Sequence, residues 1–235
     1  WESFTSKILG LKEGGISVAP CAEKLMSEGV YFSNVFASGD RTDKGIVSVL
    51  SGYPAQPTTS IVKEPQKAGK LNGLPSFFSN RGYDSRFFYG GETEFANMKA
   101  YLLGTGFNQI TDVNAFSQND RNSKWGAHDN VVKDSVSHAL SRIGRPFFLN
   151  WLTLSSHEPF ETPVPAVIRG ETDEARFLNS MHYSDSVIND LIQYCKKQTW
   201  WDSTLIVIIA DHGHRLPKAK SKLDDFRIPM IWLGG

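Results

Sequence analysis

The amino-acid sequence predicts an α/β fold in which a largely parallel central sheet has helices on both of its faces. Short apolar runs alternate with amphipathic stretches along the chain, the order expected when crossover helices join the strands of a sheet. The runs Phe147–Leu154 and Leu205–Ala210 are almost continuously apolar, which is typical of parallel strands buried on both faces. No break in composition divides the 235 residues, so we expect a single domain over residues 1–235.

The same patterns locate the individual elements. Apolar runs predict strands at Val30–Ala37, Ser85–Tyr89, Pro146–Leu154, Thr204–Ala210 and Ile228–Leu233. Helical spacing predicts helices at Asp43–Ser51, Leu74–Asn80, Thr93–Leu102, Asn130–Ile143 and Glu174–Lys197. The last of these helices has a stripe that we expect in the core, formed by Leu178, Met181, Asp185, Ile188, Leu191, Ile192 and Cys195. Loops rich in proline, glycine and threonine are expected at residues 52–70, 114–125 and 157–170.

Charge and composition exclude some classes of function. Lysine plus arginine and aspartate plus glutamate are equal at 25 each, and no basic stripe or known module indicates nucleic-acid binding. The short basic stretch 218–222 is interpreted as a solvated face. Cys21 and Cys195 could pair, or could be two free buried thiols.

The ends of the chain suggest a piece of a longer polypeptide. No apolar run in these residues is long enough to span a bilayer, and the first residues do not have the pattern of a signal peptide. The chain opens abruptly at Trp1 and stops at Gly235, just after a predicted strand. We therefore expect membrane segments, if the parent protein has them, to lie outside these residues.

Acidic and imidazole side chains follow two of the apolar strands. Asp211-His212-Gly213 comes directly after the strand that ends at Ala210, and His157 follows the strand that ends at Leu154. Ligands gather at the carboxyl ends of strands in open parallel sheets. Because Gly213 permits a tight turn, Asp211 and His212 could both reach one cation. The alternative is an aspartate that caps the next turn beside an exposed histidine.

Thr42, at the start of a predicted helix, allows two interpretations. As an N-cap, its hydroxyl would accept backbone N–H groups of the first turn. A helix N-terminus also suits a phosphate or sulfate group, and a divalent cation would lower the pKa of the hydroxyl enough to make it a nucleophile. The two roles are compatible, because one residue can start the helix and attack the substrate.

Taken together, these stretches resemble the sulfatase-like branch of the alkaline phosphatase superfamily, and most closely the catalytic domains of lipoteichoic acid synthases and related phosphoglycerol transferases. Each motif alone is only moderately specific. The motifs occur in the family's order over nearly the whole chain, which makes the resemblance strong. The resemblance implies the three-layer α/β sandwich of that superfamily. The motifs that carry it are Glu2-Ser3-Phe4, the stretch Leu25–Gly39, Arg41-Thr42-Asp43, the stretch Gly82–Gly91, Phe95-Ala96-Asn97, Trp125-Gly126 with Asp129, the stretch Ser156–Phe160, and Asp211-His212-Gly213.

The resemblance also implies a metal centre and a nucleophile. It assigns one divalent metal ion, manganese in this branch, with zinc, magnesium or calcium as alternatives. Thr42 would be the nucleophile, and His157 would contact the substrate's phosphate or the leaving group. Glu2 gains a role only through the resemblance. The implied metal ligands are Glu2, Thr42, Asp211 and His212.

The chain departs from the lipoteichoic acid synthase pattern where a glycerol phosphate would be gripped. Those enzymes have a histidine at the position of Tyr89, and a tryptophan and an arginine within the stretch that here contains Ala96 and Met98. Tyr89 thus stands among the substrate-binding candidates, and Arg41 or Lys99 would have to supply the positive charge.

The predicted function is metal-dependent transfer or hydrolysis of phosphate esters through a covalent phospho-threonine, with phosphoglycerol taken from a lipid donor. A sulfuric-ester hydrolase or a phosphoethanolamine transferase on the same scaffold is one alternative. No cysteine or serine stands at the nucleophile turn, which disfavours the sulfatase chemistry that uses formylglycine. A catalytically inactive binding module is the other alternative. The family places such domains on the extracytoplasmic side of the cytoplasmic membrane, anchored through segments outside this chain.

Overall fold

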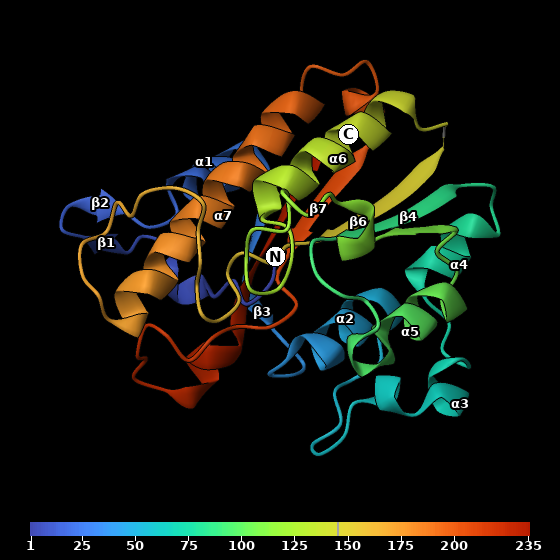
Figure 1. Cartoon of the computed structure of the whole chain (residues 1–235), viewed down its shortest axis with the longest axis horizontal. Helices are drawn as coiled ribbons and strands as arrows, with labels where there is room; N and C mark the ends of the chain where they lie inside the picture. The colour runs from blue at the N-terminus through green and yellow to red at the C-terminus, as the bar shows by residue number, and fades with distance from the viewer. Residues whose placement is uncertain (145) are drawn as a thin grey trace. The chain divides into compact units, whose positions relative to one another are not determined.

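The computed structural model describes residues 1–144 and 146–235, and of Phe95 it describes only the backbone. The described residues form two compact units. The first contains residues 1–37 and 155–235, and the second contains residues 38–154. The mixed α/β fold class is confirmed, whereas a single domain over residues 1–235 remains a prediction. Figure 1 shows the elements of each unit along the colour gradient.

The second unit is built on a parallel sheet with the strand order β5-β4-β6. Strands β4 (Asp84–Tyr89) and β6 (Phe147–Leu152) were predicted, whereas the short edge strand β5 (Gln109–Thr111) was not. Phe88 of β4 lies between Thr111 and Trp151 of its two neighbours. The ribbon in Figure 1 has α4 (Leu74–Ser79) and α5 (Met98–Gly104) on one side of these strands and α6 (Asp129–Arg142) on the other.

The helices of this unit enclose an apolar core. The helix α2 (Thr42–Ser51) and the short α3 (Pro65–Ala68) contribute to it together with α5 and the sheet. Large side chains in the core are Ile46, Val47, Leu50, Val62, Phe87, Met98, Tyr101, Leu102, Phe107 and Leu152.

One predicted helix of the second unit is interrupted. The prediction ran from Thr93 to Leu102, but Ala96 and Asn97 have φ of 54° and 60°. These left-handed angles break a right-handed helix, so α5 begins only at Met98. The side chain of Phe95, part of the same motif, lies outside the described residues.

The first unit contains an antiparallel sheet with the order β3-β8-β7. All three strands were predicted, and they span Val30–Phe36 (β3), Arg227–Gly234 (β8) and Leu205–Ile209 (β7). The continuous apolar run of β7 was expected to form a parallel strand buried on both faces, and this expectation was wrong. It pairs antiparallel with β8, and Leu205 and Val207 are 58% and 46% exposed. An apolar run does not specify the direction of its partner or what covers its second face.

Two helices of the first unit pack against each other, α1 (Pro20–Glu28) and α7 (Asp173–Cys195). The helix α1 was not predicted. Its N-cap residue supplies no side-chain hydrogen bond, and Asp185 of α7 takes over that role. The Asp185 carboxylate accepts the backbone N–H groups of Cys21 at 2.8 Å and Ala22 at 2.7 Å. The predicted core stripe of α7 is confirmed, with Leu191 half-buried and its other members buried.

The remaining elements are short. The hairpin strands β1 (Lys12–Glu13) and β2 (Ile16–Ser17) belong to the first unit. The 3-10 turns are η1 (Ser6–Ile8), η2 (Ile61–Lys63), η3 (Phe95–Asn97), η4 (Val113–Ala115), η5 (Trp201–Ser203) and η6 (Lys222–Phe226).

Two open questions from the sequence concern the cysteines and membrane spans. Cys21 and Cys195 are free thiols, and burial raises the pKa of each to about 12, helped at Cys21 by the neighbouring Asp185. Thiols of such high pKa are poor nucleophiles. Among the described residues, no helix has both the length and the apolar character needed to cross a bilayer.

Candidate metal centre and active-site residues

The turn after β7 buries an acid and an imidazole side by side. Asp211 and His212 are 6% and 7% exposed. The turn needs glycine next, since a Cβ on Gly213 would lie 2.1 Å from the carbonyl oxygen of Asp225. Asp211 accepts hydrogen bonds at Oδ1 from the backbone N–H groups of Ser3 at 3.0 Å and His212 at 2.8 Å. These bonds orient its other oxygen, Oδ2, away from the backbone.

Glu2 lies beside this turn, although about two hundred residues of sequence separate them. It is 2% exposed. Its carboxylate accepts a hydrogen bond from the hydroxyl of Ser3 and another from the hydroxyl of Ser156 at 3.1 Å. The single proton of the Ser156 hydroxyl is shared with the carbonyl oxygen of Glu2, which lies closer, at 2.6 Å. The two hydroxyls therefore hold the carboxylate in one orientation.

Glu2, Asp211 and His212 form one cluster, in which one ligand atom from each residue lies within 4.8 Å of the others. His212 Nε2 is 3.6 Å from Glu2 Oε1 and 3.7 Å from Asp211 Oδ2. His212 Nδ1 lies 2.7 Å from the carbonyl oxygen of Gly213. Because a carbonyl only accepts, Nδ1 carries the proton, and in the neutral ring Nε2 presents its lone pair toward the carboxylates. A backbone carbonyl that fixes the tautomer in this way is typical of metal-binding histidines.

The charge balance of the cluster favours a bound cation. Burial raises the pKa of Glu2, and the negative charge of Asp211 raises it further. Asp211 Oδ2 is buried and has no hydrogen-bond partner among the described residues. An unsatisfied buried carboxylate oxygen is costly unless a cation balances it. Two carboxylates and one imidazole also form a donor set that suits manganese or zinc, so the residues fit a divalent metal ion.

His157 lies close enough to the cluster for its positive form to lower the pKa of Glu2. Its ring is half-buried, and Nδ1 is 3.0 Å from the carbonyl oxygen of Glu158. By the same argument as for His212, Nδ1 is the protonated atom in the neutral ring. His157 and the Asp211–His212 pair follow two different predicted strands. All three residues belong to the first unit.

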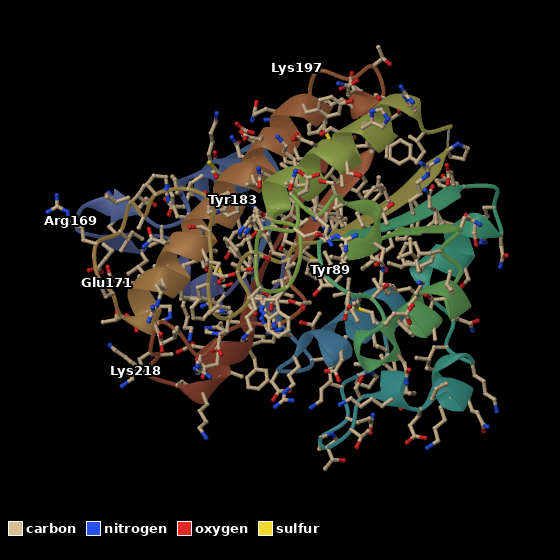
Figure 2. All side chains as sticks on the ribbon, in the orientation of Figure 1. Tyr89, Arg169, Glu171, Tyr183, Lys197 and Lys218 are labelled. Carbon is tan, nitrogen blue, oxygen red and sulfur yellow. The ribbon has the colours of Figure 1, made fainter. Side chains whose placement is uncertain are left out.

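The other predicted site residues belong to the second unit. Thr42 is the first residue of α2 rather than its N-cap, which is Arg41. The extended Arg41 makes no side-chain capping bond, and its side chain is exposed. Tyr89, labelled in Figure 2, ends β4 with its ring against Gly91. Lys99 forms an ion pair with Glu94 at 2.8 Å, and this pairing raises the pKa of Lys99.

Some residues around the cluster were not singled out from the sequence. Ser3 and Ser156 lie within recognised motifs but were given no role, since a serine hydroxyl near a strand end has no distinctive pattern. His214, which follows Gly213, was also given no role, and it is half-buried. Its ring stacks on Phe177 at 4.3 Å between centroids and makes an edge contact with Phe160 at 5.7 Å. Only the tertiary structure brings these rings together.

The chain is similar to curated bacterial proteins over most of its length. The chain is 28% identical over 222 residues to lipoteichoic acid synthase 2 of Bacillus subtilis, which covers 90% of this chain and 34% of that protein. It is 26% identical over 214 residues to phosphoglycerol transferase I of Xanthomonas campestris, covering 82% of this chain and 30% of that protein. The chain thus spans about a third of the length of these curated relatives.

A solved structure and a family model extend the comparison to the fold. The crystal structure of a protein in the alkaline phosphatase superfamily from Vibrio parahaemolyticus superposes with a TM-score of 0.86 and 30% identity, over 99% of this chain and 58% of that one. The model of the family described as Sulfatase matches residues 1–234. The resemblance inferred from the motifs is confirmed, and the chain belongs to the sulfatase family.

Proposed function

We propose that this chain is the catalytic part of a metal-dependent phosphotransferase, which moves a phosphoglycerol group from a lipid donor to a hydroxyl acceptor. The observation that carries the proposal is the buried cluster of Glu2, Asp211 and His212, with the unsatisfied oxygen of Asp211 facing the other two groups. The names of the relatives, a lipoteichoic acid synthase and a phosphoglycerol transferase, support this substrate class.

In this proposal Glu2, Asp211 and His212 hold one divalent ion, and Thr42 is its further ligand. When bound, such an ion lowers the pKa of a ligated hydroxyl and neutralises phosphate oxygens. Ser3 and Ser156 orient the Glu2 carboxylate, and the carbonyl of Gly213 holds the proton of His212 on Nδ1. Manganese is the preferred ion, and the donor set also accommodates zinc.

Thr42 acts as the nucleophile in two balanced steps. Its hydroxyl loses a proton, Oγ1 forms a bond to phosphorus, and the bond from phosphorus to the lipid alcohol breaks. The departing oxygen takes up a proton. An acceptor hydroxyl then attacks the same phosphorus and releases Thr42. The backbone N–H groups at the start of α2 suit the phosphate charge that develops.

His157 and residues of the second unit have supporting roles in the proposal. His157 contacts the phosphate or protonates the leaving oxygen, a role that imidazoles commonly have in catalysis. Arg41, Tyr89 and Lys99 contact the substrate headgroup. The exposed Arg41 is the stronger cation for this purpose, because Lys99 is already paired with Glu94. The proposed site of action is the extracytoplasmic side of the cytoplasmic membrane.

Mass spectrometry after rapid mixing with a fluorescent phosphatidylglycerol tests the proposal. We expect a phosphoglycerol adduct on Thr42 in the manganese-loaded chain, and none in Thr42→Ala. Turnover in this variant should fall at least about 10⁴-fold, as for the loss of other enzyme nucleophiles. Ser60→Ala, which removes a hydroxyl bonded to the carbonyl of Asp43, serves as a folded control.

The same assay separates the proposal from its alternatives. Turnover of an aryl sulfate in preference to aryl phosphate and glycerophospholipid would favour a sulfuric-ester hydrolase. Transfer from phosphatidylethanolamine alone would favour a phosphoethanolamine transferase. Ligand binding without turnover, equal in the wild type and Thr42→Ala, would indicate an inactive binding module.

A further inference from the structure

The segment between the metal cluster and β8 is strongly cationic and was left without a role. It begins His214-Arg-Leu-Pro-Lys-Ala-Lys-Ser-Lys-Leu223, a run without an acid, and Asp224 and Asp225 follow before β8. We call residues 215–223 the cationic loop. Its charged side chains are exposed, and they belong to Arg215, Lys218, Lys220 and Lys222. Figure 2 shows Lys218 pointing away from the ribbon into solvent.

The lysines of the loop are not neutralised by the protein. Throughout residues 1–144 and 146–235, no carboxylate lies within ion-pair distance of Lys218, Lys220 or Lys222. Only Arg215 is paired, with Glu158 at 2.6 Å. The positive charge at the tip of the loop is therefore available to an external partner.

The loop also presents an apolar side chain among its lysines. Leu223 is 60% exposed, the largest exposed fraction among the large apolar residues described. It lies in the short turn η6, where the hydroxyl of Ser221 accepts the N–H of Leu223. Leu223 follows the last lysine of the loop and is followed by Asp224. An exposed leucine beside a run of lysines can contact lipid headgroups, since the apolar group can enter the acyl boundary while the cations contact phosphates. A soluble polyanion would use the lysines but not the leucine.

The base of the loop is anchored in the first unit. At one end, His214 stacks on Phe177, and its Nδ1 accepts the N–H of Leu216 at 3.1 Å. At the other end, Asp225 forms an ion pair with Lys7 at 2.6 Å. Gly213 packs against the backbone of Asp225, so the two ends of the loop are held together directly beside His212. The base of the cationic loop therefore lies beside the metal cluster.

We propose that the cationic loop docks the chain on a membrane surface rich in anionic phospholipid, with Leu223 inserted between headgroups. Docking there would hold the cluster of Glu2, Asp211 and His212 at the level of the headgroups. The docking proposal rests on the proposed function in one respect: docking would bring a lipid donor to the metal cluster.

Flotation with vesicles tests the docking without any turnover. The wild-type chain, loaded with manganese, is mixed with vesicles of phosphatidylcholine alone or with added phosphatidylglycerol. We expect binding only to the anionic vesicles, and weaker binding as salt is raised. The triple variant Lys218→Gln/Lys220→Gln/Lys222→Gln should bind about 100-fold more weakly, because each lysine near such a surface contributes roughly fivefold. Leu223→Ser should bind about tenfold more weakly.

The control variant changes the same net charge elsewhere. Lys12, Lys70 and Lys197 are exposed lysines outside the loop, and their simultaneous change to glutamine should weaken vesicle binding by less than about threefold. An equal loss in both triple variants would overturn the proposal, because it would show attraction by net charge alone. Loop-dependent binding to soluble polyphosphate, without vesicle binding, would overturn it in favour of a polyanionic partner.

Two further measurements separate failure of the docking from failure of the proposed reaction. Asp211→Asn should bind anionic vesicles like the wild type, since the docking does not use the cluster. On a soluble short-chain donor, the loop variant should keep the wild-type turnover, whereas on vesicle-borne donor its KM should rise and its kcat should change little. Loss of vesicle binding in Asp211→Asn would contradict the proposal. So would equal loss of turnover on both donors.

Discussion

Two buried acidic sites in the first unit are held in different ways. Asp185 is 1% exposed, and each of its oxygens accepts a backbone N–H from the first turn of α1. In the cluster of Glu2 and Asp211, two carboxylates lie together with His212, and one oxygen of Asp211 has no hydrogen-bond partner among the described residues. Asp185 completes the first turn of α1 and therefore has a structural role. The incompletely bonded pair is suited to a cation, because one divalent ion can balance the charge of both carboxylates.

The comparison teaches that burial alone does not identify a functional acid. Burial raises the pKa of both Glu2 and Asp185. The two acids differ in the group that compensates the buried negative charge. Asp185 uses the N–H groups of a helix end, which are always present in the folded chain. Asp211 Oδ2 has no hydrogen-bond partner among the described residues, which favours compensation of its charge by a bound cation.

The largest expected effect comes from removing the unsatisfied acid. Asp211→Asn should lower manganese affinity by more than about 100-fold, because it removes a charged ligand rather than one of its supporting groups. Phosphotransfer should fall with it. Metal content measured by mass spectrometry after gel filtration gives the readout, and Asp185→Asn is the matched control. Equal metal content in wild type and Asp211→Asn would show that the cluster is not a metal site.

The next effect concerns Asp185 and the pH dependence of stability. Burial raises its pKa from 3.8 to about 6 against the hydrogen bonds from Cys21 and Ala22. The folded chain therefore binds this proton more tightly than the unfolded chain. The stabilising contribution is complete below about pH 4 and is lost as the pH rises through about 6. Between these limits the free energy of unfolding should fall by about 3 kcal/mol more in wild type than in Asp185→Asn.

Urea denaturation at a series of pH values, in the presence of a chelator, measures this difference. The chelator removes any contribution of metal binding at the cluster. Profiles that run parallel for wild type and Asp185→Asn would mean that Asp185 ionises in the folded chain as easily as in the unfolded one.

The smallest expected effect tests the groups that orient Glu2. Ser156→Ala removes the hydroxyl that donates to the Glu2 carboxylate, and loss of such a supporting bond should weaken metal binding about tenfold. Ser180→Ala is the control, since Ser180 is also buried but donates to the carbonyl of Phe177 within its own helix. Isothermal titration with manganese compares the variants. A similar loss of affinity in both would attribute the effect to general loosening of the fold.

Much of the fold could be predicted from local patterns. The strands β3, β4, β6, β7 and β8 were all found close to their predicted bounds, because each is an apolar run bounded by polar or turn-forming residues. The long helix α7 and its core stripe followed from helical spacing. The parallel or antiparallel direction of each strand was harder to predict from the sequence. The antiparallel pairing of β7 with β8 depends on which surfaces of the chain meet, and an apolar run does not specify its partner strand.

Two helices show where local patterns fail. The start of α1 is completed by a carboxylate from α7, at Asp185, so nothing near Pro20 predicts its cap. The interruption before α5 depends on left-handed angles at Ala96 and Asn97, and alanine is a residue that local preference would keep helical. In both cases tertiary contacts override the local signal.

By itself, the sequence determined the α/β class, the positions of the main strands, and the placement of Asp211 and His212 at a strand end, since these follow from short-range periodicity and from the residues that end each run. Glu2 was grouped with that pair only through the resemblance to a known family. Only the tertiary structure decided that Ser156 joins them and that His212 presents Nε2 to the carboxylates. It also decided that Asp185 is a helix cap. Each of these depends on groups brought together across long stretches of chain, and such contacts leave no periodic pattern in the residues on either side.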